Sequence, residues 1–488
     1  MIIEHPQWAL KFKKKGTELR CIRGKYYLYQ VSSIWDKEKK KARKISGKCL
    51  GSISPEGFKP TISKIEPDYS INPPTVKMYA GTAFFINEFN NWLPVLQKYF
   101  PNNWQQIFCL ACLRLFYKAP VKNIPFLYEQ SFFSEIYKSL PFSDKTISKT
   151  LHDIGSNQSA IEDYMKSFAQ AKHVVLIDAT PIFTKSQNIY EAKLGYNNKQ
   201  RWDNQINLLY LYDRDLALPL FYRLIEGDIR EIRTLEITIN SSGLNNIILV
   251  GDKGFTSELN LEITSQAHLN YILPLKRNSS YIDYTPLQPF EQTRMDGYFK
   301  YKDRYIWYKE RKIDETKRVI LFLDESLRLS EQKDYLDRVD KHPEEYNVKG
   351  YHDNQFKMGT LSTIDNVGDK VAKDIYYTYK SRCEIEQLFD CFKNTLNADR
   401  TYMHSIESIQ GWMFINHLAI SAYYKIYKTL KEKELLDKIS VCDIIEHLTH
   451  INAIKINSKW YLQEISAKTT NMLKKIKIEI PITWLGQS

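Results

Sequence analysis

The sequence predicts an α/β protein with a mixed sheet, because short apolar strands alternate with helical segments from residue 174 onward. The clearest strand is the β-branched run Val174–Ile177, which ends at Asp178 and has the length of a buried strand. Hairpin-linked strands followed by helix, strand, helix and strand are typical of a layered α/β fold. The expected elements are strands at 174–177, 205–212 and 218–224, a helix at 231–240, a strand at 246–250, a helix at 257–267 and a strand at 271–275.

Other regions precede and interrupt this α/β layer. The first fifty residues alternate and break like a small β-meander, and the stretch 51–74 has the Pro, Ser and Gly content of a linker. Helical periodicity covers 75–171 and resumes near 371, whereas strands at 298–312 and 318–323 and a polar helix at 329–339 are expected between them. The predicted layout is a basic β-meander at 1–58, a helical and candidate DNA-binding domain at 75–171, the α/β layer at 172–276 and 371–430, a β-rich insertion at 277–370, and a helical C-terminal region at 431–488.

Composition indicates a packed, soluble protein. Of the 488 residues 43% are hydrophobic and 26% are charged, which argues against a mainly disordered chain. The longest apolar helical candidate, 412–424, is too short to span a membrane and contains Asn416 and His417. The first ten residues include Glu4, His5 and Pro6, so no signal peptide is expected. We therefore expect a cytoplasmic protein with no membrane partner.

Positive charge is concentrated at the N-terminus. Residues 1–50 hold 14 Lys and Arg against 4 Asp and Glu, a net charge of +10, whereas the remaining 438 residues contribute only +2 of the total of +12. Such a segment indicates a polyanionic partner, because Lys and Arg release counterions from DNA or RNA. Its cations are expected in turns and loops, where they would bind phosphates without regard to sequence. A solubilising basic tail is the alternative.

The seven cysteines do not form the pattern of a disulfide framework, because their number is odd and the chain is long. Cys109 and Cys112 are the only close pair, and they lie in the apolar helical run 107–117, so buried thiols are predicted rather than a zinc site. In the same helical region, Ser143 is a good N-cap for a helix with an apolar stripe. A helix-turn-helix DNA reader and a structural bundle account equally for this region.

Two aspartates stand out because each ends an apolar strand. Asp178 follows Val174–Ile177, and Asp252 follows the strand at 246–250 and precedes the tight exit Lys253-Gly254-Phe255. Catalytic groups of an open sheet project together at strand ends. For an isolated aspartate at such a place, a helix N-cap or a solvated position is the more common role.

The third carboxylate is placed by helical geometry. At 100° per residue, four side chains fall within a stripe about 60° wide, namely those of Tyr379, Arg382, Glu386 and Lys393. The apolar side chains cluster roughly 90° away, on the expected core face, and they are Ile385, Leu388, Phe389, Phe392 and Leu396. A solvated helix edge carrying an Arg382–Glu386 ion pair is the alternative.

Phosphodiester cleavage would use such a set of side chains. Carboxylates are the oxygen ligands that hold Mg²⁺, and two divalent ions about 4 Å apart stabilise the attacking and leaving oxygens. Neighbouring Lys and Arg side chains would hold the phosphates of the substrate.

The spacing Tyr379-x2-Arg382-x3-Glu386-x6-Lys393 resembles the Y-R-E-K signature of bacterial insertion-sequence DDE transposases of the insertion-sequence-four superfamily. Asp178 and Asp252 are similar to the first and second aspartates of that family. The stretch Gly195-x5-Arg201-x-Asp203-x-Gln205-x-Asn207 is similar to its second-strand region. The resemblance covers about residues 15–430.

The resemblance implies a ribonuclease-H-like catalytic core with a β-rich insertion between the second Asp and the Glu. It also implies a cut-and-paste transposase in which Asp178, Asp252 and Glu386 bind two Mg²⁺ ions, for which Mn²⁺ can substitute. Tyr379, Arg382 and Lys393 would bind the DNA. The implied partners are double-stranded DNA, as terminal inverted repeats and target, and a second copy of the chain in a homodimer. The implied location is the cytoplasm of a bacterium or archaeon, at the nucleoid.

Two other functions remain open at this stage. One is a ribonuclease-H-like DNA nuclease that cuts without strand transfer. The other is a domesticated DNA-binding protein without catalysis, although an intact carboxylate triad argues against it. No phosphate-binding G-x-x-x-x-G-K-[ST], G-x-S-x-G or H-E-x-x-H motif is present.

Overall fold

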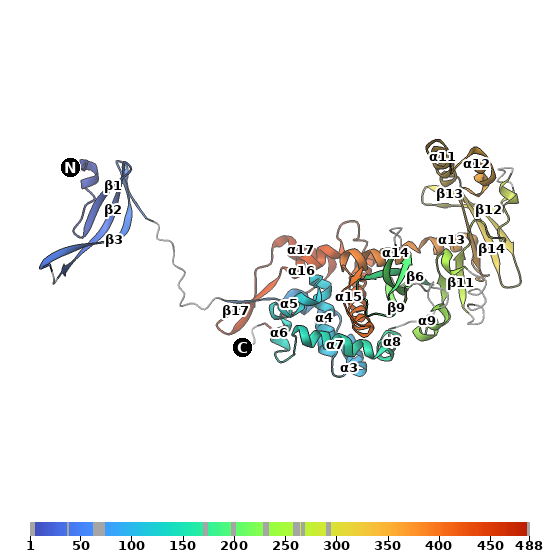
Figure 1. Cartoon of the computed structure of the whole chain (residues 1–488), viewed down its shortest axis with the longest axis horizontal. Helices are drawn as coiled ribbons and strands as arrows, with labels where there is room; N and C mark the ends of the chain where they lie inside the picture. Colours follow the sequence, from blue (N-terminus) through green and yellow to red (C-terminus); the bar gives the residue numbers. More distant parts are fainter. Residues whose placement is uncertain are drawn as a thin grey trace. The chain divides into compact units, whose positions relative to one another are not determined.

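The computed structural model describes residues 5–36, 39–61, 74–168, 174–196, 202–227, 234–256, 264, 269–288 and 294–485. It divides into two compact units, residues 1–74 and 75–488 (Figure 1).

The first unit is an antiparallel four-stranded meander in the order β1-β2-β3-β4. Its elements are α1 (Gln7–Leu10), β1 (Thr17–Ile22), β2 (Lys25–Asp36), β3 (Lys41–Ser54) and β4 (Gly57–Pro60). A small core of Ala9, Leu19, Leu28 and Ile53 lies between the helix and the sheet. The predicted meander is confirmed, but the prediction of a linker from residue 51 is wrong up to residue 60. Apolar side chains at 53 and 58 pack on this core, so the chain continues as strand. Residues 62–73 lie outside the described part.

The second unit is built on a mixed sheet of eleven described strands, and this confirms the predicted α/β class. The path of the sheet is β12-β13-β14-β15-β11-β10-β6-β8-β7, with β16 paired to β6 and β9 paired to β8. The strands are β6 (Val174–Thr184), β7 (Lys193–Tyr196), β8 (Trp202–Asp213), β9 (Leu218–Glu226), β10 (Ile248–Val250), β11 (Asn270–Pro274), β12 (Gly297–Tyr301), β13 (Arg304–Lys312), β14 (Arg318–Asp324), β15 (Thr360–Asp365) and β16 (Arg400–Thr401).

The predicted core strands are present, and β6 is longer than expected. It continues past Asp178 to Thr184, because Ile182 and Thr184 return to the buried side and the ladder to β8 runs on. The predicted turn after β8 forms as well, since Asp213 Oδ1 accepts hydrogen bonds from the backbone of Asp215 and Leu216. Of the helix predicted at 257–267, only Thr264 lies within the described residues.

The segment 277–370 extends the central sheet. The strand β15, which the sequence analysis missed, pairs antiparallel with both β11 and β14 and so joins this segment to the core. The single strand predicted at 298–312 is wrong, because a turn with Lys302 at φ 54° divides it into β12 and β13. The predicted polar helix is α11 (Glu325–Lys341).

Helices of the region 75–171 pack against the long helix α15 (Ile406–Glu432). The apolar stripe of α7, predicted from its N-cap at Ser143, is buried against α15. Cys109 and Cys112 are buried in α4, as predicted. The helices here are α2 (Ala80–Glu88), α3 (Trp92–Tyr99), α4 (Trp104–Tyr117), α5 (Ile124–Gln130), α6 (Phe133–Ile136), α7 (Asp144–Ser156) and α8 (Gln158–Lys166), and the others in this unit are α9 (Leu235–Ser242), α12 (Val348–Asn354), α16 (Val441–Thr449) and α17 (Ala467–Ile476).

The prediction of a helical C-terminal region is wrong in part, because this region also contains strands. The hairpin of β17 (Asn452–Ile456) and β18 (Lys459–Leu462) pairs with β5 (Thr75–Met78) from the start of the unit. Trp460 of this hairpin packs on Phe132, which gives the strands their buried side. Among the described residues, no helix is both long and apolar enough to cross a bilayer.

Candidate active site

Two neighbouring parallel strands bring Asp178 and Asp252 to the same level. In the ladder between β10 and β6, Val250 pairs with Leu176. Each aspartate lies two residues beyond its member of this pair, so their side chains project from adjacent chains on the same side of the ladder. The carboxylate of Asp252 is near enough to help raise the pKa of Asp178. The sequence-predicted pair is therefore brought together.

Asp252 also has the local role that the sequence analysis kept open. It is the N-cap of a short 3₁₀ turn at Lys253–Phe255, and its Oδ1 accepts a hydrogen bond of 2.6 Å from the Gly254 amide. This contact fixes one oxygen of the carboxylate. Phe255 is buried in the core and anchors the turn. The cap and the pairing with Asp178 thus coexist.

Asp178 sits in a largely buried environment. Its side chain is 16% exposed. Burial raises the pKa of Asp178 to about 6, against the lowering effect of the Arg382 guanidinium, and the nearby Asp252 carboxylate raises it further. At this pKa the carboxylate is largely ionised near neutral pH, and the Arg382 guanidinium beside it favours the ionised form.

The prediction of one continuous α-helix from Tyr379 to Lys393 is wrong. Tyr379 lies in α13 (Ala372–Lys380), a turn follows at Ser381 and Arg382, and α14 (Cys383–Asp390) carries Glu386. A π-helical turn, Cys391–Thr395, then carries Lys393. Because a π turn advances the side chains differently from an α turn, the angle predicted for Lys393 does not hold. π turns are frequent at functional sites.

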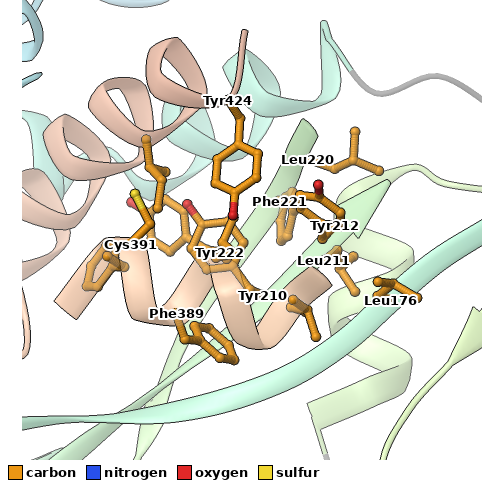
Figure 2. Packing of buried hydrophobic residues seen from close by; sticks show 14 of the residues in the cluster. Leu176, Tyr210, Leu211, Tyr212, Leu220, Phe221, Tyr222, Phe389, Cys391 and Tyr424 are labelled. Carbon is orange, nitrogen blue, oxygen red and sulfur yellow. The ribbon is translucent and has the colours of Figure 1, made fainter. Parts of the chain in front are cut away.

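The predicted core face of this segment is confirmed. Ile385, Leu388 and Leu396 are fully buried, and Phe389 is nearly so. The Phe389 ring lies edge-on to Tyr210 of β8, with centroids 6.4 Å apart (Figure 2). Tyr210 in turn hydrogen-bonds to His417 of α15, its hydroxyl 2.6 Å from Nδ1. The helix that carries Glu386 is therefore fixed on the sheet by its opposite, apolar side.

Arg382 connects the strand carboxylate to the helix carboxylate. Its Nη1 donates to Asp178 Oδ2 at 2.8 Å, and its Nη2 donates to Oε1 of Glu386. The Arg382 side chain is 20% exposed, whereas the Glu386 side chain is 55% exposed. Burial by itself lowers the pKa of Arg382, but the carboxylates of Asp178 and Glu386 outweigh it and raise the pKa overall. The ion pair predicted on the helix edge exists, and it extends to the sheet.

Tyr379 lies beside the same group. Burial raises the pKa of Tyr379, and the carboxylates of Asp252 and Glu386 raise it further, whereas the Arg382 guanidinium lowers it. Its hydroxyl therefore stays protonated and can donate a hydrogen bond. Lys393 is half-buried on the π turn. The structure thus gathers Asp178, Asp252, Tyr379, Arg382 and Glu386, while Lys393 lies seven residues beyond Glu386 on the same segment.

The donor chemistry of the three carboxylates fits a hard divalent cation such as Mg²⁺. In the part of the chain that the structure describes, however, no three His, Cys, Asp or Glu side chains are close enough to hold an ion. The Arg382 guanidinium contacts both Asp178 and Glu386 and takes the position beside them that a cation would need. In this arrangement the carboxylates of Asp178 and Glu386 hold the guanidinium, and a metal ion between them would require Arg382 to move.

A shifted pKa alone would not have identified this site. Asp365 in β15 is fully buried and pairs with Arg318, Nε to Oδ1 at 3.0 Å, and burial raises its pKa to about 6 as well. The same guanidinium is held by Glu310, at 3.0 Å, and by the Val367 carbonyl, at 3.1 Å. This buried pair links the neighbouring strands β14 and β15, whereas the group at Asp178 reaches solvent through the exposed Glu386.

The stretch from Gly195 to Asn207, which resembles the second-strand region of the family, makes structural contacts in its described residues. Gln205 and Asn207 of β8 donate to the Gly227 carbonyl, at 3.3 Å in both cases. Gly195 and Asp203 pair across β7 and β8. Arg201 lies outside the described residues. These amides tie the end of β9 to β8.

Sequence reasoning missed that Arg304 of the β12–β13 hairpin lies near Lys380, the residue after Tyr379. The β12–β13 hairpin packs on α13 through aromatic rings, with Phe299 and Tyr376 centroids 5.4 Å apart, and the Tyr377 hydroxyl donates to the Lys300 carbonyl. Lys380 follows Tyr379, and burial together with the nearby Arg304 lowers its pKa. The two cations belong to distant segments of the chain, so only the aromatic residues of the hairpin could have indicated the contact.

A known protein family matches the part of the chain that carries this site. The family model described as the transposase DDE domain matches residues 169–422, which is 254 of the 488 residues and thus more than half of the chain. Among curated proteins, none has a significantly similar sequence. One similar solved structure is described as a piggyBac transposase synaptic complex with hairpin DNA, at 10% identity and a TM-score of 0.40, covering 78% of this chain and 82% of that one.

Proposed function

The chain belongs to the transposase DDE domain family, and we propose that it is a cut-and-paste transposase that cleaves DNA at the ends of its element and joins them to target DNA. It is thus a DNA transposase, an enzyme that cleaves DNA. The observation that carries the detailed proposal is the meeting of Asp178 and Asp252 on adjacent parallel strands, with Glu386 joined to Asp178 through Arg382. The spacing from Tyr379 to Lys393 supports membership of the insertion-sequence-four group from bacteria.

In this proposal the sheet around β6, β8 and β10 with α14 is a ribonuclease-H-like core, split by the insertion at 277–370. The region 75–171 and the N-terminal meander are the candidate DNA-binding parts. Transposase DDE domains use divalent metal ions. Asp178, Asp252 and Glu386 would hold two Mg²⁺ ions, which Mn²⁺ can replace, and bound ions would stabilise charge on the attacking and leaving oxygens.

The remaining side chains act on the DNA itself. Arg382 would exchange its carboxylate partners for a phosphate beside the scissile bond, because a guanidinium binds both groups in the same bidentate manner. Tyr379 would donate a hydrogen bond from its hydroxyl to a phosphate oxygen, and Lys393 would contribute charge further along the strand. The 3′ hydroxyl freed by cleavage is then the nucleophile that attacks the target.

Two further parts of the proposal concern the assembly. Both ends of an element must be cut and joined together, so a homodimer holding two ends is the expected active form. Its substrates are double-stranded terminal inverted repeats and target DNA, and its place is the cytoplasm, at the nucleoid. The basic N-terminal unit supports a DNA partner through its charge.

A cleavage assay and a joining assay test the proposal separately. Terminal-repeat DNA, taken from the flanks of the gene, is incubated with the protein and Mg²⁺, and nicked products are resolved. Pre-cleaved ends with a free 3′ hydroxyl are then offered together with plasmid DNA. Cleavage without joining would indicate a nuclease, and binding without cleavage a domesticated DNA-binding protein. Cleavage followed by joined products is the expected result.

A further inference from the structure

The hairpin of β2 and β3 extends beyond the rest of the N-terminal sheet. β1 pairs with β2 only from Lys25 to Gln30, and β4 pairs with β3 only from Gly51 to Ser54. Residues 31–36 and 41–46 therefore pair only with each other among the described strands, from Val31 opposite Ser46 to Asp36 opposite Lys41. We call these two stretches the ribbon. Figure 1 shows it as the long end of the first unit.

Cations are concentrated along the ribbon and its turn. Within the described residues 31–36 and 39–46 there are five of them against the single carboxylate of Asp36, and their side chains are exposed. They are Lys39, Lys40, Lys41, Arg43 and Lys44, of which Lys44 also pairs with Glu18 at 2.6 Å. The expectation that the N-terminal cations lie in turns and loops is wrong for Lys41, Arg43, Lys44 and Lys48, because they lie on β3 in a defined register.

Large apolar side chains lie exposed between these cations. Trp35 is 62% exposed, Ile34 is 60% exposed and Ile45 is 40% exposed. Alternation along the strands puts Trp35 and Lys44 on one face of the ribbon and Ile34, Ile45 and Arg43 on the other. Both faces thus combine apolar surface with positive charge.

We propose that this ribbon binds duplex DNA by entering a groove, with its cations on the flanking phosphates and the face that carries Trp35 against the groove floor. The major groove of B-form DNA is about 12 Å wide and admits a two-stranded β-ribbon. Paired strands lie about 4.8 Å apart, which leaves room for side chains on both sides. The charge of the ribbon is complementary to the two phosphate chains that border the groove.

Protection of a free strand edge does not explain the whole pattern. Lysines on an exposed edge prevent pairing between molecules, and this accounts for part of the charge. It does not account for Trp35 and Ile34, because exposed apolar side chains on an edge would promote such pairing. An apolar contact with thymine methyl groups on the groove floor gives Trp35 a use.

The charge contribution is tested in the full-length protein with random-sequence B-form duplexes over a salt series. Lys39, Lys40, Lys41 and Arg43, exposed cations of the ribbon and its turn, are changed together to Gln. The log–log slope should fall by about 0.9 for every phosphate that is no longer neutralised, hence by up to about 3.6 for all four substitutions. The matched control changes Lys11, Lys13, Lys14 and Lys15 to Gln, four exposed cations of the same unit outside the ribbon. It should reduce the slope by less than half as much.

The apolar contribution is tested at the same duplex. Trp35→Ala should weaken binding roughly fivefold at every salt concentration without changing the slope, since an apolar side chain displaces no counterions. Trp35→Phe should retain most of the affinity. None of the substituted residues belongs to the core of Ala9, Leu19, Leu28 and Ile53. Thermal unfolding of each variant checks that the N-terminal unit stays folded.

Three results would overturn the proposal. Equal salt-dependence slopes for the ribbon variant and its control would show that the ribbon cations contribute no more to DNA binding than other cations of the unit. Unchanged affinity of folded Trp35→Ala would exclude groove contact. Equal or tighter binding of an RNA duplex of the same length would favour RNA, whose major groove does not admit the ribbon. The inference rests on the proposed function only for its DNA partner. Its failure would leave cleavage at the carboxylates intact, whereas failure of the proposed function would show as absent cleavage with binding unaltered.

Discussion

The Arg382 guanidinium lies 2.8 Å from the carboxylate of Asp178, a residue 204 positions earlier in the chain. This contact joins the middle of β6 to the start of α14, and the same guanidinium holds Glu386. Without DNA or metal, the positive charge that these carboxylates require is therefore supplied by the protein. A phosphate that draws Arg382 away would leave two carboxylates free for a cation, so binding of DNA and of metal should favour each other.

Changing Glu386 to Gln should lower cleavage of element ends by on the order of 10³-fold or more, because a neutral amide is a poor ligand for a hard cation. Binding of the same DNA should persist. The matched control is Glu384→Gln in the same helix, whose carboxylate accepts from Lys431 at 3.5 Å instead. Gel assays of cleavage and of binding distinguish the two. Wild-type cleavage by the Glu386 variant would remove this residue from the mechanism.

Changing Arg382 to Gln should weaken both end binding and cleavage, each by about 10- to 100-fold, where every tenfold corresponds to about 1.4 kcal/mol. The reason is that a phosphate contact near the scissile bond contributes to both steps. Arg382→Lys should recover charge but not the bidentate contact. Arg338→Gln on the exposed face of α11 is the control. A variant that cleaves normally at saturating DNA would limit Arg382 to binding.

The buried pair of Asp365 and Arg318 predicts a pH effect on stability in metal-free protein. The folded pKa of Asp365, about 6, lies above the usual 3.8, so the folded state binds the proton more tightly. Its contribution to stability is therefore present at low pH and lost as pH rises through about 4 to 6. As pH rises across this window, the free energy of unfolding of Asp365→Asn should therefore increase relative to that of wild type by up to about 3 kcal/mol.

Urea unfolding of wild type and variant at several pH values measures that difference. His417, whose pKa burial lowers to about 3, acts in the opposite direction but equally in both proteins, so it cancels. Asp314→Asn is the control. A hydrogen bond from the Thr316 backbone lowers the pKa of Asp314. The effect of Asp314 on the pH dependence of stability is therefore expected below the pH range of about 4 to 6. A constant difference between wild type and Asp365→Asn would show that folding does not raise the pKa of Asp365.

How much the sequence could predict depended on whether the signal was local. The strand before Asp178 and the core face with Ile385 and Leu388 were predicted correctly, because both follow from the periodicity of a few residues. The break after Tyr379 and the π turn at 391–395 were not, since neither stretch contains a Gly or Pro that would signal an interruption. Tertiary packing decides such interruptions.

Contacts between distant segments were beyond the reach of periodicity. The strand β15 is recognised only through its partners β11 and β14, and the cation Arg304 approaches Lys380 only because the β12–β13 hairpin packs on α13. The link from Arg382 to Asp178 is of the same kind. The helix edge predicted the pair with Glu386, while the sheet that completes it lies about two hundred residues away.

The crossing of α7 and α15 gives a test of stability. At Gly155 and Gly411 the two helices approach so closely that a Cβ on Gly411 would overlap the Leu151 carbonyl, and one on Gly155 the Glu407 carbonyl. Backbone atoms cannot move aside as a side chain can, so Gly411→Ala should lower the free energy of unfolding by about 2–4 kcal/mol. Gly368→Ala, where a Cβ meets nothing within 4 Å, should be nearly neutral. Urea unfolding compares the two, and equal stability would mean that the helices can separate at no cost.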